Sequence, residues 1–228
     1  MKWFNAIIDL FYPNLCLSCF NYIANYDHYV CSQCLLMLDY IPNSDTTNSE
    51  VKRRFYGKLK LDHAYASFYY NESGIVQSLL HHLKYHNKQG ISEFLALLTI
   101  NHLQNHELFK WADYIVPVPL HKKKQKIRGY NQLSKFGETL AKHYDLIYME
   151  DFLIKTTNTQ TQTKKNMIER ASSNAEYYIN TKYLSIENKN ILIIDDVITT
   201  GSTLELIGNI ILKNSSNKIS ILTMAYTR

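Results

Sequence analysis

The pattern of apolar and polar positions predicts that strands and helices alternate over most of the chain. Buried strands are predicted where short apolar, β-branched or aromatic runs occur: residues 63–70, 114–119, 191–194 and 218–225. Apolar residues recur at helical spacing between them, which predicts helices over 72–85, 91–103, 131–143 and 203–213. Such alternation is typical of an α/β fold with a parallel sheet. Ligands of these sheets bind beyond the carboxyl ends of the strands, so candidate chemistry is expected there.

The first eleven residues form a separate apolar segment. An amphipathic helix is predicted because apolar residues recur at helical spacing, at Phe4, Ile7, Ile8 and Phe11. Asn5 and Asp9 interrupt the segment and no small-residue cleavage site follows, which argues against a signal peptide. We expect this helix to pack on the protein's own core, with binding to a membrane surface as the alternative. No stretch reaches the ~18 apolar residues of a spanning helix, so no membrane span is expected.

All four cysteines lie in two short motifs near the N-terminus. Cys16 and Cys19 form one C-x-x-C pair, and Cys31 and Cys34 form a second pair after 11 intervening residues. Two such pairs can supply four thiolates to one zinc ion in a closed, structural site. Disulfides or a redox pair are the alternatives, but no export signal is visible and a redox site needs only one pair. Zinc would also stabilise a module of about 40 residues, which rarely folds without such a link.

The chain is therefore expected to have three parts. Residues 1–41 hold the N-terminal helix and the zinc module, the polar residues 42–54 form a linker, and residues 55–228 form the α/β domain. Apolar residues make up 46% of the 228 and charged residues 20%, which excludes a disordered chain, collagen or a coiled coil. The formal net charge of +5 permits a phosphorylated or nucleic-acid partner without requiring one.

The densest candidate chemistry follows the strand at 191–194. Two carboxylates, Asp195 and Asp196, are followed by a loop of small residues before the next helix: Thr199, Thr200, Gly201, Ser202 and Thr203. The N–H groups and hydroxyls of such a loop form a phosphate cradle, and glycine allows close approach. The carboxylates can bind sugar hydroxyls or a divalent cation. An ordinary helix cap at Ser202 or Thr203 is the alternative, but two adjacent buried carboxylates are costly without a ligand.

Residues 191–203, ILIIDDVITTGST, resemble the 13-residue phosphoribosyl-pyrophosphate (PRPP) motif of type I phosphoribosyltransferases. The resemblance implies that Asp195 and Asp196 are catalytic residues that contact the ribose hydroxyls. It implies that residues 199–203 bind the 5′-phosphate, and that Mg²⁺ accompanies PRPP. The expected fold class is then α/β, a type I phosphoribosyltransferase-like parallel sheet with a small N-terminal zinc module built on the four cysteines.

Two polar stretches complete the candidate site. Residues 121–128, HKKKQKIR, hold five Lys/Arg directly after the strand at 114–119. We expect a basic loop that meets pyrophosphate or a nucleic-acid backbone, with a solvated surface as the alternative. Arg128 is expected to make a fork-type phosphate contact, and Gly129 to allow the turn. Residues 159–170, TQTQTKKNMIER, predict either a mobile loop that closes over a reactive intermediate or an ordinary surface loop.

The order of these parts resembles the ComF (ComFC) family of competence-associated proteins. A cysteine knuckle, PVPL-basic-RGYNQ, a Gln/Thr loop with an arginine and DDVITTGST follow one another in the family's order, and Lys84-Tyr85 adds to the match. Lys155 stands where the family has an arginine. The resemblance implies a cytoplasmic role in DNA uptake during natural transformation. It also implies PRPP or a related phosphoribosyl ligand, to whose binding Lys84 would contribute.

Three hypotheses of function follow. The first is an enzyme that transfers a phosphoribosyl group from PRPP to an unidentified acceptor, mainly by positioning and charge stabilisation, because no general base is evident. The second is a non-catalytic protein that binds single-stranded DNA through the zinc knuckle, the basic stretch and exposed tyrosines, with PRPP or a nucleotide as regulatory ligand. The third is an adaptor whose zinc module docks on a competence helicase-like partner.

Overall fold

The computed structural model describes most of the chain in seven stretches. They are residues 13–23, 29–42, 49–103, 107–120, 122–155, 177–213 and 215–228. The helix expected over residues 1–11, the loop expected over 159–170 and residues 43–48 of the expected linker lie outside them. Among the described residues, no helix combines the length and the apolar character needed to cross a membrane.

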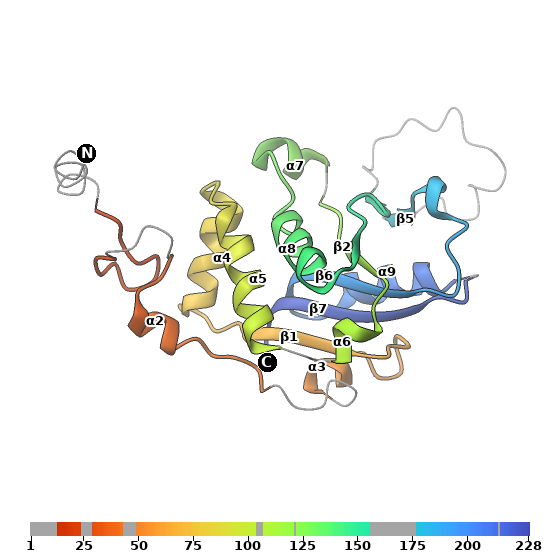
Figure 1. Cartoon of the computed structure of the whole chain (residues 1–228), viewed down its shortest axis with the longest axis horizontal. Coiled ribbons are helices and arrows are strands. Elements are labelled where there is room, and N and C mark those ends of the chain that lie inside the picture. The colour runs from red at the N-terminus through yellow and green to blue at the C-terminus, as the bar shows by residue number, and fades with distance from the viewer. Residues whose placement is uncertain are drawn as a thin grey trace.

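A five-stranded parallel sheet forms the centre of the molecule, with the strand order β1-β7-β6-β2-β3 (Figure 1). The strands are β1 Ala64–Tyr69, β2 Tyr114–Pro117, β3 Ile147–Tyr148, β6 Asn190–Ile198 and β7 Lys218–Tyr226. β1 is buried throughout and β7 is buried after Lys218, as expected for parallel strands covered on both faces. The predicted parallel α/β fold is therefore confirmed.

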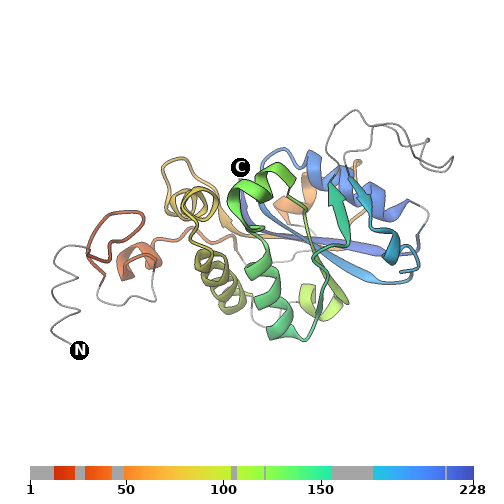
Figure 2. The same cartoon turned by 90° about the horizontal axis from the view of Figure 1, so that it is seen from above.

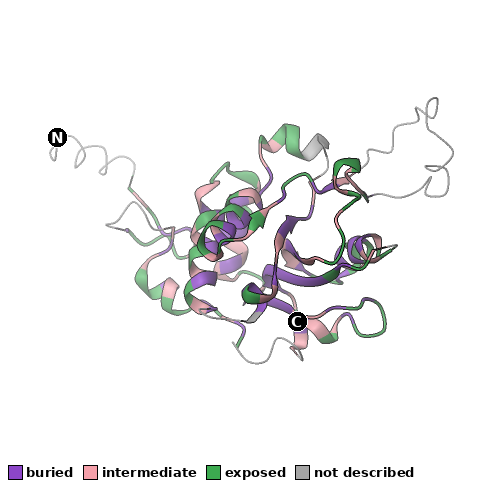
Figure 3. Cartoon of the chain, turned by 45° about the vertical axis from the view of Figure 1, so that its right-hand side comes forward, coloured by how far each residue is buried: buried purple, intermediate pink, exposed green. Residues whose placement is uncertain are grey.

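Helices cover both faces of this sheet. They are α4 Ile75–Tyr85, α5 Gly90–His102, α6 Glu107–Trp111, α8 Ser134–Tyr144 and α9 Ser202–Leu212. The β2-α8-β3 and β6-α9-β7 connections run in opposite directions along the sheet, and right-handed crossovers then place α8 and α9 on opposite faces. Figure 2 shows α5 and α8 on one face and α9 on the other, and Figure 3 shows the buried strands between them. The strand order reverses between β6 and β2, which opens a crevice at their carboxyl ends.

Two expectations about this crevice are corrected by the extent of its elements. Asp195 and Asp196 were expected beyond the end of a strand, but β6 continues to Ile198 because β7 pairs with it as far as Tyr226. On its other side, β2 ends opposite Ile194, so both carboxylates lie where β6 has only one neighbouring strand. The expected basic loop is instead helix α7, Lys122–Arg128.

Several short elements have no counterpart in the sequence prediction. β4 Leu153–Lys155 and β5 Tyr177–Ile179 form a separate antiparallel pair, and η2 Thr181–Tyr183 is one 3-10 turn. Helix α3, Glu50–Arg53, lies within the stretch expected to be a linker. The last residues of that stretch are therefore folded, and α3 packs against β1.

The cysteine segment lies at one end of the molecule, beside α4 and α5 (Figures 1 and 2). It contains helix α2, Ser32–Leu36, and an isolated bridge between Leu15 and Tyr22. The Tyr29 ring meets the Phe94 ring of α5 edge-on, with 5.5 Å between centroids. Buried apolar residues of the segment join the core of the sheet domain, so the two parts share one packed interior.

Candidate functional site

The two adjacent aspartates of β6 have different partners. Asp196 forms a 2.8 Å ion pair with Lys84, at the end of α4. It also accepts a 3.1 Å hydrogen bond from the Gln132 side chain. Asp195 accepts the backbone N–H of Asp196 at 2.8 Å. Asp196 is thus held by charge and hydrogen bonds from two other elements. Lys84, which the resemblance marks, lies at the candidate site.

Burial and neighbouring charge act most strongly on Asp195. Burial, and then the negative charge of Asp196, raise the pKa of Asp195 to about 8. The ammonium groups of Lys84 and Lys155 oppose this rise without cancelling it. A carboxylate whose pKa is raised in this way gains from a nearby cation or a hydrogen-bond donor, because either favours its charged form. The site therefore favours a ligand that brings positive charge or hydroxyl donors.

Residues 199–203, called here the hydroxyl loop, turn the chain from β6 into α9. Gly201 is the N-cap of α9 in the left-handed region, with φ of 81°. Thr200 and Ser202 share a 2.9 Å hydrogen bond between their hydroxyls, and both residues are exposed. Among the described residues, no side chain caps α9 through the N-cap position. The Ser202 N–H donates to the Thr200 hydroxyl at 3.4 Å, and all four hydroxyl side chains of the loop are exposed beside the N-terminus of α9, which suits an anion.

The basic stretch after β2 reaches the aspartates through one glutamine. Arg128, at the end of α7, donates to the Gln132 side chain, which in turn donates to Asp196. Gly129 has φ of 81° and its N–H bonds the Gln125 carbonyl at 2.7 Å, so the left-handed turn that ends α7 lies there. Tyr130 donates to the Leu83 carbonyl and ties this turn to α4. Arg128 and Gly129 were expected at the site, whereas Gln132 was not singled out.

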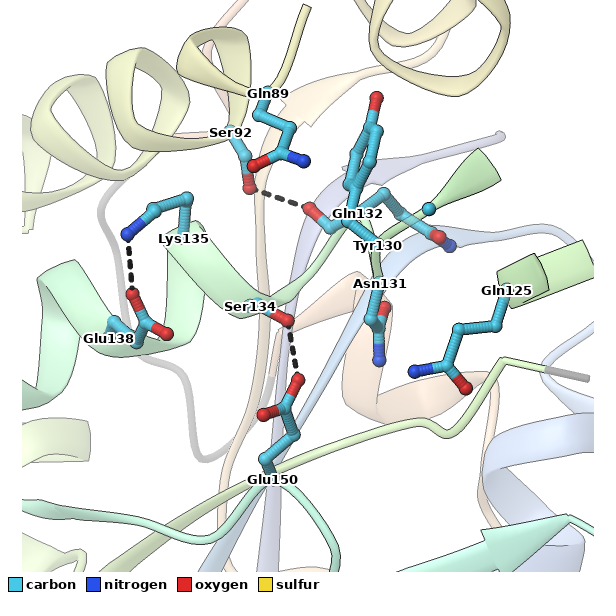
Figure 4. A pocket seen from close by; sticks show the side chains of 11 residues that line it. Gln89, Ser92, Gln125, Tyr130, Asn131, Gln132, Ser134, Lys135, Glu138 and Glu150 are labelled. Atoms are coloured by element: carbon cyan, nitrogen blue, oxygen red, sulfur yellow. Dashed lines mark hydrogen bonds and ion pairs between the residues drawn. The ribbon is translucent and has the colours of Figure 1, made fainter. Parts of the chain in front are cut away.

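A cavity of about 270 Å³ is lined in part by Gln132, whose side chain donates to Asp196. Figure 4 shows its polar lining from α5, α7 and α8, with Ser92 donating to the Gln132 carbonyl and Ser134 donating to Glu150. These bonds measure 2.6 Å and 2.7 Å. Lys135 pairs with Glu138 at the same rim. Ser92 thus holds the main chain of Gln132, while the Gln132 side chain bonds Asp196.

The four cysteines are brought together as the two C-x-x-C pairs predict. Their Sγ atoms all lie within 4.8 Å of one another, and those of Cys19 and Cys31 are 3.6 Å apart. Thiolates on one tetrahedral zinc ion would be separated by about 3.8 Å, given Zn–S bonds of about 2.3 Å. Burial raises the pKa of Cys16, but the backbone N–H groups of Cys19, Cys31 and Ser18 outweigh it and lower the pKa to about 6. Burial and the neighbouring thiols instead raise the pKa of Cys34 to about 12, so it is the spacing of the four Sγ atoms that fits a metal with a preference for thiolates.

One residue at the hydroxyl loop could not have been found from local pattern. Arg54, directly after α3, donates to the Thr199 carbonyl at 2.9 Å across 145 positions of sequence. Its only sequence signal is a run of three basic residues, Lys52-Arg53-Arg54, at the end of a polar stretch, which is also typical of a solvated surface.

Comparisons with known proteins find one domain family and several relatives that are similar to this chain. The phosphoribosyl transferase domain family matches residues 139–228, which include β6, the hydroxyl loop and α9. The chain is also similar to competence protein ComFC of Bacillus subtilis, with 35% identity over 113 residues, or 48% of this chain and 43% of that protein. Competence protein F of Haemophilus influenzae is 27% identical over 152 residues, 64% of this chain and 66% of that protein. DNA utilization protein YhgH of Escherichia coli is 27% identical over 154 residues, 65% and 66% of the two chains.

These relatives confirm the expected similarity to the ComF family, and the match over residues 139–228 confirms the expected similarity to phosphoribosyltransferases. The chain spans less than half the length of the ComFC protein that it matches. A solved adenine phosphoribosyltransferase from Leishmania tarentolae overlaps 66% of this chain and 74% of its own, with 13% identity and a TM-score of 0.36.

Proposed function

We propose that this protein binds PRPP together with Mg²⁺ in the crevice between β2 and β6 and transfers its phosphoribosyl group to an acceptor. One observation carries the proposal: the Asp195–Asp196 pair near the end of β6 and the hydroxyl loop that follows lie on one continuous stretch of chain leading into α9. The pair offers oxygen acceptors for ribose hydroxyls, and the loop offers N–H and hydroxyl donors for the 5′-phosphate. A sugar phosphate is thus held at two ends.

The residues of the chain would act mainly by positioning and by charge. Asp195 and Asp196 would orient the ribose, while Arg128 would neutralise part of the leaving pyrophosphate. Lys84 would hold Asp196 in place, since the two form a 2.8 Å ion pair. Carboxylates are ligands that suit Mg²⁺, and the ion supplies charge neutralisation of the pyrophosphate when bound.

The named relatives suggest where this chemistry is used. Two carry the name competence protein and one the name DNA utilization protein. On that basis we propose a role in DNA uptake or use during natural transformation, in the cytoplasm. The acceptor would then be a component of that process.

The test is the thermal shift caused by PRPP with Mg²⁺, in the wild type and in the Asp195→Asn/Asp196→Asn variant. Ligand at ~100 times its dissociation constant adds ~2.7 kcal/mol to the folded state, so a bound wild type should melt at a higher temperature. The variant should show no shift, because the ribose loses both acceptors. Each protein is compared with itself, with and without ligand, since the substitutions alter stability on their own.

Pyrophosphate release then separates binding from transfer. With PRPP bound, a panel of bases, amines and nucleotides should include an acceptor that releases pyrophosphate from the wild type only. A shift without release from any acceptor would leave a PRPP-binding protein without transferase activity. No shift in folded, metal-loaded wild type would remove PRPP as the ligand.

A second candidate function is binding of single-stranded DNA, which the basic helix α7 favours. Its seven residues include five Lys/Arg beside the candidate crevice. The cysteine segment does not add to such a surface, since residues 3–51 contain no lysine or arginine. Phosphate contacts depend on such cations, so DNA would be bound by α7 and its neighbours rather than by the zinc module.

The metal proposed for the cysteine cluster is zinc in a structural role. Four thiolates leave no open position for water, so no chemistry is assigned to the ion. Its contribution would be to the folding of residues 13–42.

A further inference from the structure

The segment around Arg54 lies directly against the hydroxyl loop. The Arg54 guanidinium donates from Nη1 to the Thr199 carbonyl at 2.9 Å. From Nη2 it donates to the Tyr226 hydroxyl at 2.7 Å and to the Thr227 carbonyl at 2.9 Å. The same group lies over the Tyr226 ring, 4.8 Å from its centroid. Arg54 thus links the hydroxyl loop to the end of β7 through both arms of its fork.

Phe55 packs directly against the glycine of the hydroxyl loop. A Cβ atom on Gly201 would come within 2.9 Å of Phe55 Cε1 and 3.1 Å of Cζ. Phe55 is only 1% exposed, so it cannot move aside into solvent. The glycine of the hydroxyl loop is therefore required by this contact as well as by its positive φ.

Helix α3 fixes this pair of residues to the sheet. The Ser49 hydroxyl donates to the Ala64 carbonyl at 2.5 Å, and the Lys52 ammonium donates to the Asp62 carbonyl at 2.7 Å. Val51 is fully buried under the same helix. Arg54 and Phe55 are thus presented from a rigid support, which a positioning role requires.

The Arg54 contact orients a peptide group of the loop. In a trans peptide the carbonyl of one residue and the N–H of the next point in opposite directions. Because Arg54 draws the Thr199 carbonyl toward itself, the Thr200 N–H points away from Arg54. Donors that are aimed before the ligand arrives cost no reorganisation when it binds.

We propose that Arg54 and Phe55 position the hydroxyl loop for a ribose 5-phosphate group, so that the stretch after α3 is part of the ligand site. This inference rests on the proposed function, since it takes the loop to bind the 5′-phosphate of PRPP. Arg54 is a positioning residue: it holds the loop from behind and does not contact the ligand. Arg54 therefore contributes to binding of the 5′-phosphate end of PRPP and does not contribute to binding of the pyrophosphate end.

The test is calorimetric titration of PRPP, ribose 5-phosphate and pyrophosphate, each with Mg²⁺, into wild type, Arg54→Ala and Arg54→Lys. Arg54→Ala should weaken binding of PRPP and ribose 5-phosphate about tenfold or more, which is the scale of a lost hydrogen bond from a charged group. Its affinity for pyrophosphate should stay within about twofold. Arg54→Lys should restore binding only in part, because one ammonium cannot replace both arms of the fork.

Arg53→Ala is the matched control, because it removes the same charge one residue earlier from an exposed position. It should bind all three ligands as the wild type does. Tyr226→Phe removes one acceptor of Nη2 and should weaken ribose 5-phosphate binding about threefold, which keeps the test open if Arg54→Ala does not fold.

Three results would overturn the inference alone: unchanged ribose 5-phosphate binding by Arg54→Ala, full restoration by Arg54→Lys, or an equal loss for pyrophosphate. Full restoration would mean simple charge attraction, and an equal loss would mean general damage to the fold. A wild type that binds none of the three ligands would instead overturn the proposed function, and this inference with it.

Discussion

At the scale of single residues, Asp195 carries an energetic cost that its neighbour does not share. Asp196 is paired with Lys84 and Gln132, whereas burial and the charge of Asp196 raise the pKa of Asp195 to about 8. A group whose pKa is higher in the folded protein than in the unfolded chain stabilises the fold below its unfolded pKa. That stability is lost as the pH rises through the folded pKa. We therefore expect that the Asp195 carboxyl lowers the stability of the folded protein and that its value lies in binding the ligand.

The Asp195→Asn variant tests this cost without any ligand. Asparagine resembles the neutral acid, so the variant should be more stable than the wild type at pH 8, by about 1–2 kcal/mol if only part of the shift is realised. The difference should shrink toward zero near pH 4, where both proteins carry a neutral group. Urea unfolding of both proteins at several pH values measures it.

Asp151→Asn is the control, because the pKa of Asp151 is lowered in the folded protein whereas that of Asp195 is raised. Bonds from Lys182 and Tyr183 lower the pKa of the Asp151 carboxyl, so its contribution is present at neutral pH and lost in acid. Asp151→Asn should therefore give no gain at pH 8. An Asp195→Asn variant that is no more stable than the wild type at pH 8 would contradict the assigned burial cost.

At the scale of elements, sequence pattern succeeded where apolar periodicity was strong. The four strands and four helices expected from it correspond to β1, β2, β6, β7 and to α4, α5, α8, α9. The misses have two physical causes. β3, β4 and β5 have two or three residues each, too few for a period to appear. Helix α7 has charged and polar residues at nearly every position, so its sequence shows no apolar face.

The residues of the candidate site also fall into two groups: those that a sequence motif could reveal and those that it could not. The aspartates and the hydroxyl loop are contiguous in sequence, so one motif could reveal them. Arg54 and Gln132 reach the site from elements far along the chain, by hydrogen bonds across 145 and 64 positions. Such contacts depend on how the sheet and the helices pack. The local sequence around each residue therefore gives no signal for them.

Substitutions in helix α7 test the second candidate function, the binding of single-stranded DNA. If it binds single-stranded DNA, Lys122/Lys123/Lys124→Ala should weaken binding, because the variant neutralises fewer phosphates. The slope of log K against log salt should fall by about 0.7 for each phosphate that is no longer neutralised. Fluorescence anisotropy with a labelled oligonucleotide at several salt concentrations measures both the affinity and the slope.

Lys58/Lys213/Lys218→Ala is the matched control, because it removes three exposed lysines away from α7, one of them at the start of β7. It should leave both the affinity and the salt slope near the wild-type values. Equal affinity in both triple variants would exclude α7 as a DNA-binding element.

At the scale of the whole molecule, the cysteine segment completes the sheet domain rather than standing apart from it. β1 is an edge strand in the order of the sheet. Residues 39–41 cover part of that edge: the Tyr69 N–H donates to the Asp39 carbonyl at 2.8 Å, and the Ile41 N–H donates to the Ser67 carbonyl at 3.0 Å. An uncovered edge strand invites pairing with another chain. The metal proposed for the cysteine cluster would thus also help to protect this edge of the sheet.

Removal of the metal should therefore affect β1 as well as the cysteine segment. The purified protein should contain one zinc ion per chain, and a zinc chelator should increase hydrogen exchange in residues 13–42 and in β1. β6 and β7 lie inside the sheet and should keep their protection. Light scattering should then rise with time as exposed β1 edges pair. Cys34→Ser should behave like the chelated protein, and Ser32→Ala, between the second pair of cysteines, like the wild type. Unchanged protection of β1 after complete loss of zinc would show that the sheet does not depend on the module.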